Sequence, residues 1–433
     1  MSEAPGLVRA IGRWDLTAAI INAVIGSAVF SLPSVLAGLT GAWSPLTCVL
    51  AGLGILTTVL CVAEVASRFT EAGGPYLYAR EAFGRDVGFQ AGWLTFWIRV
   101  TSAAANLNVF IEYLSPVVPA LGRGPGRAAT MAVLMALITT INVIGVRQAA
   151  WAVDVLTAAK LLPLVLLVVV GLPHMSAAVM ASQAVARPSW TEAVLLLVFA
   201  YGGFESPLIV AGEVRRPRRD SAFALLVGLA VIAAVYTLVQ LVVVGVVPSL
   251  AGTTAPLAAA YRRLVGGAGV LLITAGAMIS TFGLATGSVL QAPRLLFSMA
   301  QRSELPALLG RVHPRFRTPD VAILAYAAVT LGFGLYGSFQ WNATLSAIVR
   351  LVTYSLICAA LPIFRRRGGE EPGFRAPAAA LVVPLALGFC LWLLSTRTFA
   401  QAWILGLLML AGWGLGRAAR FARGRTALTS PGR

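Results

Sequence analysis

The sequence has 433 residues, of which 58% are hydrophobic and only 11% are charged, and its mean hydropathy is +0.85. Soluble domains carry about 25% charged residues, so this composition excludes a soluble protein and indicates an integral membrane protein. The formal net charge of +17 is the one feature that suggests a nucleic-acid partner. The distribution of the arginines along the chain, described below, argues against that partner.

Apolar runs long enough to cross a membrane follow one another along almost the whole chain. A spanning helix needs about 20 consecutive, mainly apolar residues. The predicted spans, in chain order, are 16–38, 42–66, 88–115, 128–146, 151–172, 190–213, 221–247, 267–299, 320–337, 342–364, 377–396 and 399–416. The connections between them are short, so we expect an all-α integral membrane protein with twelve transmembrane helices in one domain, 1–433.

The basic residues are distributed unequally between the two sets of loops. Cytoplasmic loops of membrane proteins are enriched in Lys and Arg. If the N-terminus is cytoplasmic, 24 of the 33 basic residues fall on the cytoplasmic side and six on the opposite side. This bias predicts a multi-pass protein of the plasma membrane, which in a bacterium is the inner membrane, with both termini in the cytoplasm. It also explains the net charge without nucleic acid.

Two of the predicted spans contain helix-weakening residues near their middle. The first span contains Ile25–Pro33 and the sixth contains Phe199–Pro207, and each has small residues followed by Phe-x-x-Pro. Hydrocarbon offers no partner to free backbone groups, so broken helix is tolerated where it lines a cavity. Because five spans separate the two segments, the second would be inverted in the membrane, as in transporters with a site between two interrupted helices. Close helix packing through glycine is the alternative interpretation.

The two breaks predict complementary halves of a binding site for a zwitterion. Backbone N–H groups at the start of the second half-helix of span 1 would favour a carboxylate, and free carbonyls at the end of the first half of span 6 would accept from an ammonium. Phe204 is either an apolar gate or a packing residue. The predicted substrate-binding residues are Ile25, Gly26, Ser27, Ala28, Phe199, Ala200, Tyr201, Gly202 and Phe204.

Lys160, in the fifth span, is the only lysine in the chain. A buried lysine can lose its proton near neutral pH, whereas arginine effectively cannot. We interpret Lys160 as a titrating group, or as a fixed ammonium that replaces a bound cation between helices. The alternative is an ammonium that snorkels to the cytoplasmic surface.

Glu205 places a carboxylate at bilayer depth, which is costly unless it is protonated, paired or facing water. We expect it to be a proton acceptor or counter-ion near the site. Arg99, in the third span, needs an acid such as Glu205 or Glu112, or it faces the pocket and favours an anionic substrate side chain. Ser280 and Thr281, in the eighth span, either join helices or face Lys160 or the substrate. The predicted coupling residues, which would take the place of a bound cation, are therefore Lys160, Glu205, Ser280 and Thr281.

The sequence contains no catalytic constellation, phosphate loop or metal-ligand spacing. Its four cysteines stand singly in apolar runs, so neither a disulfide nor a zinc site is expected. We therefore expect neither an enzyme nor a bound metal or cofactor.

Several motifs in this order resemble those of the amino acid–polyamine–organocation (APC) superfamily of transporters. Ile25–Phe30 is similar to the break in the family's first span, and Phe199–Glu205 to its sixth span. The connections Glu64–Phe69, Gly73–Tyr78, Arg294–Phe297 and Phe374–Pro377 also resemble the family's connections. Val155–Leu162, Phe199–Gly203 and Ser280–Gly283 look closest to the L-type and related bacterial neutral amino acid permeases.

The resemblance implies a LeuT-like five-plus-five inverted repeat, with broken helices 1 and 6, over 16–172 and 190–364, and two additional helices over 377–416. It implies that the two breaks hold the substrate and that Lys160 occupies the place of a sodium ion, so that transport is sodium-independent. Ala28 departs from the family, which usually has glycine there. Glu205 is more similar to the proton-linked or exchanging branches, and the loop 116–127 has no cysteine for a disulfide-linked accessory chain.

These observations predict a secondary active amino acid transporter that works by alternating access. It is expected to be proton-coupled or to exchange neutral L-amino acids, with small-molecule amino acids and the lipid bilayer as its partners. One alternative is a polyamine or amino acid/amine antiporter, which would rely on Glu205 rather than on the Gly26–Ala28 dipole. A substrate-sensing membrane receptor is an alternative of another class, but the tail after Gly416 is short for a signalling domain.

Overall fold

The structure is a computed structural model, and it describes residues 11–69, 73–144, 150–208, 214–368 and 371–429. In these segments the regular secondary structure is helical, apart from one isolated bridge between Ile11 and Val214. The α-helices are α1 (Arg13–Val24), α2 (Ser27–Thr40), α3 (Ser44–Ala66), α4 (Gly74–Phe83), α5 (Arg85–Leu114), α6 (Pro119–Gly122), α7 (Gly124–Ile144), α8 (Ala150–Gly171), α9 (Ala177–Ala181), α10 (Trp190–Tyr201), α11 (Pro217–Val246), α12 (Pro256–Leu264), α13 (Gly267–Gln301), α14 (Asp320–Tyr336), α15 (Phe339–Arg367), α16 (Ala379–Ser395) and α17 (Phe399–Thr429).

Within the part of the chain that the structure describes, six helical stretches are long and apolar enough to cross a membrane. They are Ser27–Ala66, Gly124–Ile144, Pro217–Val246, Gly267–Gln301, Phe339–Arg367 and Phe399–Ala418. Four further apolar helical segments of 10–17 residues are Lys160–His174, Trp190–Tyr201, Asp320–Tyr336 and Ala379–Ser395. The prediction of an all-α protein with apolar helices of membrane-spanning length is confirmed in the described residues, whereas the twelve crossings stay a prediction.

The predicted spans overlap the helices with small shifts at their ends. The first predicted span is divided into α1 and α2, and Gly41, at φ +58°, separates α2 from α3 through a short 3-10 turn. The sixth predicted span begins with α10, which ends at Tyr201. Its last five residues, 209–213, lie outside the described residues.

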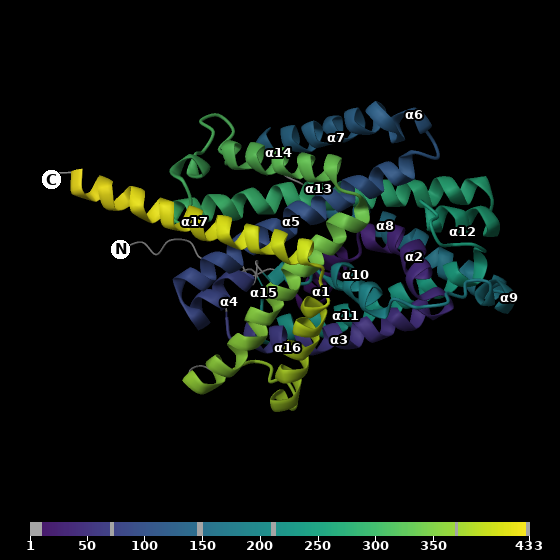
Figure 1. Ribbon diagram of the computed structural model, residues 1–433, viewed down its shortest axis with the longest axis horizontal. Coiled ribbons are helices and arrows are strands. Elements are labelled where there is room, and N and C mark those ends of the chain that lie inside the picture. Colours follow the sequence, from purple (N-terminus) through teal and green to yellow (C-terminus); the bar gives the residue numbers. More distant parts are fainter. Residues whose placement is uncertain (1–10, 70–72, 145–149, 209–213, 369–370, 430–433) are drawn as a thin grey trace.

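The buried apolar side chains form two large clusters. The first joins α1, α2 and α3 to α10, α11, α15 and α16, and so surrounds the interrupted helices. The second joins α5 and α13 to α7 and α14. Figure 1 shows α5 and α13 running side by side through the middle of the molecule, between α7 and α14 on one side and the interrupted helices on the other. The interrupted helices therefore meet the second cluster along α5 and α13.

The connecting segments gather at the two ends of this helical bundle. In Figure 1, α4 lies at the left end, toward which the last turns of α17 also run, whereas α6, α9 and α12 lie at the right end. Buried Glu304, which follows α13, lies 3.5 Å from Arg85 and 3.7 Å from Arg80. These ion pairs join α4 and the start of α5 to the end of α13.

Candidate functional site

The first break lies between α1 and α2. α1 ends at Val24, Ile25 is extended, and Gly26 has φ −137° and ψ −140°, after which α2 begins at Ser27. A Cβ on Gly26 would overlap the side-chain tip of Leu284 on α13. The predicted interruption is therefore present, and it lies against α13.

One of the backbone donors expected to face a substrate already has a partner within the chain. The Ser27 N–H donates to Asn106 Oδ1 on α5 at 3.3 Å. The Ser27 hydroxyl is buried, and among the described residues it has no hydrogen-bond partner. Asn106 thus lies directly at the break.

The second break follows α10 and lies against the first. Gly202 is extended, and Gly203 has φ +116°, a conformation that side-chain-bearing residues rarely adopt. A Cβ on Gly203 would lie 2.8 Å from the carbonyl oxygen of Ala23 on α1. Glycine therefore allows two backbone segments, 180 positions apart in sequence, to approach each other closely.

The carbonyls at the end of α10 are partly occupied by groups of the chain itself. The Phe199 carbonyl accepts from the Gly202 N–H at 3.2 Å, and the Ala200 carbonyl accepts from the Tyr236 hydroxyl of α11 at 3.0 Å. The Tyr201 side chain is engaged with α3, because its hydroxyl donates to the Cys48 carbonyl at 2.8 Å.

Lys160 of α8 reaches the first break directly. Its side chain is only 2% exposed, and Nζ donates to the carbonyls of Asn22 at 2.5 Å and Ile25 at 3.0 Å. These carbonyls lie beside the interruption, where a continuous helix would have supplied N–H donors. The alternative in which Lys160 snorkels to the surface does not fit this buried position.

Glu205 forms a buried ion pair with Arg350 of α15, at 2.5 Å between Oε1 and Nη1. The second carboxylate oxygen accepts from the Gly203 N–H at 3.0 Å and from the Tyr354 hydroxyl at 3.2 Å. Arg350 also donates to Ser102 of α5 at 3.3 Å. The carboxylate therefore has a fixed counter-ion and ties the second break to α15.

Arg99 lies near enough to Glu205 for an attractive electrostatic interaction, but among the described residues the close ion pair of Glu205 is with Arg350. Arg99 donates to the hydroxyl of Ser206, just after the second break. Glu112 instead accepts from Ser31 on α2 at 2.9 Å. Sequence reasoning missed Arg350 as the partner of Glu205, although a lone arginine inside an apolar run was the available signal.

Three further residues of the predicted site are Phe204, Ser280 and Thr281. Phe204 stacks on the Tyr354 ring, with centroids 5.2 Å apart and planes 24° from parallel. Thr281 donates to the Ala277 carbonyl of its own helix at 2.8 Å. The buried Ser280 hydroxyl has no partner among the described residues. Thr281 is thus engaged within α13, whereas Ser280 retains an unused polar group.

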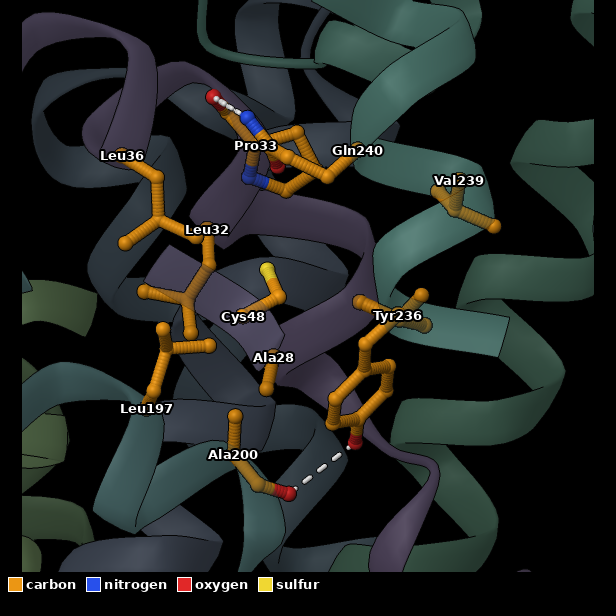
Figure 2. Close-up of a pocket in the computed structure, with 11 residues that line it drawn as sticks. Ala28, Leu32, Pro33, Leu36, Cys48, Leu197, Ala200, Tyr236, Val239 and Gln240 are labelled. Atoms are coloured by element: carbon orange, nitrogen blue, oxygen red, sulfur yellow. Dashed lines mark hydrogen bonds between the residues drawn. The ribbon is translucent and has the colours of Figure 1, made fainter. Parts of the chain in front are cut away.

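A small cavity lies beside the two breaks, between α2, α3, α10 and α11 (Figure 2). Its lining is mainly aliphatic, with Ala28 and Ala200 from the predicted site and Tyr236 and Gln240 from α11. Its volume for water-sized molecules is about 20 Å³, which is room for about one water molecule. It is too small for an amino acid.

Comparison with known proteins places the chain in a family. A family model described as Amino acid permease matches residues 11–407. The chain is 28% identical to the Serine/threonine exchanger SteT of Bacillus subtilis (strain 168) over 430 residues, which cover 95% of this chain and 96% of that protein.

Two further relatives from the same organism are similar over most of their length. The Methylthioribose transporter is 27% identical over 90% of this chain and 89% of its own. The Branched-chain amino acid permease BcaP is 26% identical over 90% of this chain and 88% of its own. The chain therefore belongs to the amino acid permease family of the APC superfamily, whose members are membrane transporters and not enzymes.

Proposed function

We propose that this protein is a secondary active transporter of neutral L-amino acids that works by alternating access without sodium. The observation that carries the proposal is the bonding of the Lys160 ammonium to the Asn22 and Ile25 carbonyls at the first break. Carbonyls of a broken membrane helix are the ligands that transporters offer to a coupling cation. A covalently attached ammonium at that position removes the need for sodium.

The proposed site for the substrate lies between the two breaks. The start of α2 supplies N–H groups and a positive helix end for the carboxylate, and the end of α10 supplies carbonyls for the ammonium. Both halves are backbone groups, so the site recognises the part common to all amino acids. The close approach of Gly203 to Ala23 supports a single composite site.

The pairing of Glu205 with Arg350 favours neutral amino acids over polyamines and other amines as substrates. An amine substrate without a carboxylate would need Glu205 as its counter-ion, but Arg350 already holds that carboxylate at 2.5 Å. A relative named as a serine/threonine exchanger supports both neutral substrates and an exchange mode. Proton coupling is the other mode, with Lys160 and Glu205 as its candidate groups.

We extend the proposal to the architecture of the protein in the membrane. The helices overlap twelve predicted spans, and the two interruptions occur at corresponding positions of residues 16–172 and 190–364. This arrangement supports a LeuT-like inverted repeat followed by two additional helices, in the bacterial inner membrane with both termini in the cytoplasm. No disulfide-linked accessory chain is part of the proposal.

Uptake into proteoliposomes tests the function and separates its modes. Radiolabelled L-serine, L-threonine and L-leucine are supplied with choline in place of sodium, with and without internal amino acid, and across a pH gradient. Uptake that needs internal amino acid identifies exchange, whereas uptake driven by an inward proton gradient identifies symport. Strict dependence on sodium, or transport of putrescine but of no amino acid, contradicts the proposal.

A further inference from the structure

Two arginines and one carboxylate meet at the second break. Arg350 of α15 is 3% exposed and pairs with Glu205 at 2.5 Å between Nη1 and Oε1. Arg99 of α5 donates to the hydroxyl of Ser206, the residue after Glu205. Among the charged side chains that act on Arg99, Glu205 attracts it and Arg350 repels it. The three side chains therefore form a single group, the Arg99–Glu205–Arg350 cluster.

This cluster carries one more positive charge than its own carboxylate balances. A guanidinium stays protonated in proteins, so Glu205 neutralises only one of the two arginines. Lys160, the cation at the first break, bonds to carbonyls and brings no negative charge to the cluster. The carboxyl-terminal end of α10 adds about half a negative charge through the helix dipole. An excess of about half a positive charge remains, and an unpaired charge inside a protein is costly.

The cluster also contains a buried donor without an acceptor. Arg350 Nη1 donates to Glu205 and to the Tyr354 hydroxyl, and Nη2 donates to Ser102. Arg350 Nε is buried and has no hydrogen-bond partner in the described part of the chain. Buried polar groups nearly always have a partner, so this N–H indicates a ligand with an acceptor. A Cβ on Gly202 would lie 2.7 Å from Nε, which places the unused donor against the break.

Arg99 makes one side of the cluster accessible. Its side chain is only half-buried, although α5 runs through the middle of the molecule (Figure 1). Because its guanidinium bonds to Ser206, the accessible atoms lie at the second break. A guanidinium has five N–H donors, and one hydroxyl takes only one of them. A small ion therefore reaches Arg99 first, with Arg350 behind it.

We infer that the Arg99–Glu205–Arg350 cluster binds a small monovalent anion, represented by chloride, in contact with both guanidinium groups. The anion accepts from Arg350 Nε and from N–H groups of Arg99, and it balances the excess charge. This inference goes beyond the proposed function, because the anion is neither the transported amino acid nor the coupling cation.

The anion and the amino acid should raise each other's affinity. The Arg350 guanidinium lies against Gly202, next to the end of α10 where the substrate ammonium is proposed to bind. Like charges repel, so an unneutralised Arg350 weakens ammonium binding. An anion beside Arg350 cancels this repulsion, and the coupling acts equally in both directions.

Replacing chloride tests the inference in two assays on the full-length protein. The first is L-threonine uptake into proteoliposomes with choline chloride or choline gluconate on both sides of the membrane. The second is the apparent Tm of the purified protein in the same two salts, which reports ion binding without transport because a ligand of the folded state raises the Tm. We expect the KM for L-threonine to be about fivefold lower in chloride and the Tm to be higher.

Arg99→Gln removes the excess charge and should abolish both differences between the salts, whereas Arg99→Lys, which keeps the charge, should retain part of them. Arg187→Gln is the matched control, because Arg187 is an exposed arginine away from the breaks. It should respond to chloride as the wild type does, and so it corrects for general effects of the two salts on the protein.

Three results would overturn the inference. The first is wild-type protein with the same KM and Tm in both salts, which decides the matter even if Arg99→Gln is not recovered folded. The second is a chloride response in Arg99→Gln equal to that of Arg187→Gln. The third is stronger competition by L-aspartate than by L-serine in gluconate, which would place a substrate carboxylate at the cluster. A wild-type protein that binds chloride in the Tm assay but transports no amino acid would instead overturn the proposed function.

Discussion

The Lys160 ammonium donates a hydrogen bond to the main-chain carbonyl of Ile25 at 3.0 Å, although the two residues are 135 positions apart in sequence. A second bond from the same ammonium reaches Asn22 at 2.5 Å. One side chain from α8 therefore holds the interruption between α1 and α2. In the proposed alternating-access cycle, movement of α1 relative to α8 would stretch or break these bonds.

Replacing Lys160 tests this relationship. Lys160→Ala leaves two buried carbonyls without donors, at a cost of about 1–3 kcal/mol each, so we expect amino acid uptake to fall at least about tenfold. Membrane insertion and elution on size-exclusion chromatography should remain normal. Arg187→Ala, at an exposed arginine, is the control. Uptake by Lys160→Ala equal to wild type at every pH would contradict a role for this ammonium in transport.

Because Glu205 and Arg350 form a buried ion pair, we expect substitutions of the two residues to have strongly non-additive effects on the apparent Tm. Removing one partner of a buried ion pair typically costs about 3–5 kcal/mol because the other charge stays buried, whereas removing both costs much less. Glu205→Gln and Arg350→Met should each lower the apparent Tm in detergent by more than the double variant does. Additive losses of Tm would show that the two side chains do not act as a pair.

Gly203→Ala probes the contact between the two breaks. The new Cβ would lie 2.8 Å from the Ala23 carbonyl oxygen on a backbone at φ +116°, which strains the site directly. We expect the KM for the transported amino acid to rise about tenfold. Gly388→Ala, in α16, is the matched control because nothing lies within 4 Å of its added Cβ. Equal KM values for the two variants would show that the close approach of the two breaks does not affect substrate binding.

The proposed topology predicts the location of the C-terminus. A fluorescent protein that matures only in the cytoplasm is fused after Arg433, and cysteine variants of the loops between predicted spans are labelled with a membrane-impermeant maleimide. We expect a fluorescent fusion, together with labelling from outside at Arg187→Cys and no such labelling at Arg317→Cys. A dark fusion that is nevertheless inserted would place the C-terminus outside the cytoplasm and contradict the proposed topology.

The amino-acid sequence by itself determined the membrane environment, the approximate positions of the long apolar helices and both interruptions. Hydropathy is additive along a helix, and glycine and proline act on their own backbone, so these features depend on neighbours in sequence. The breaks at Gly26 and Gly202–Gly203 were found for this reason. The unusual single lysine also identified Lys160 without knowledge of the fold.

Only the tertiary structure decided which partner each polar group finds. Glu205 pairs with Arg350 rather than with Arg99, and Asn106 takes the Ser27 N–H. Tyr236, which no sequence pattern distinguished, bonds to both breaks. These contacts join residues from 36 to more than 200 positions apart. They depend on the packing of whole helices, because a buried polar group is satisfied by whichever donor or acceptor the fold brings within reach.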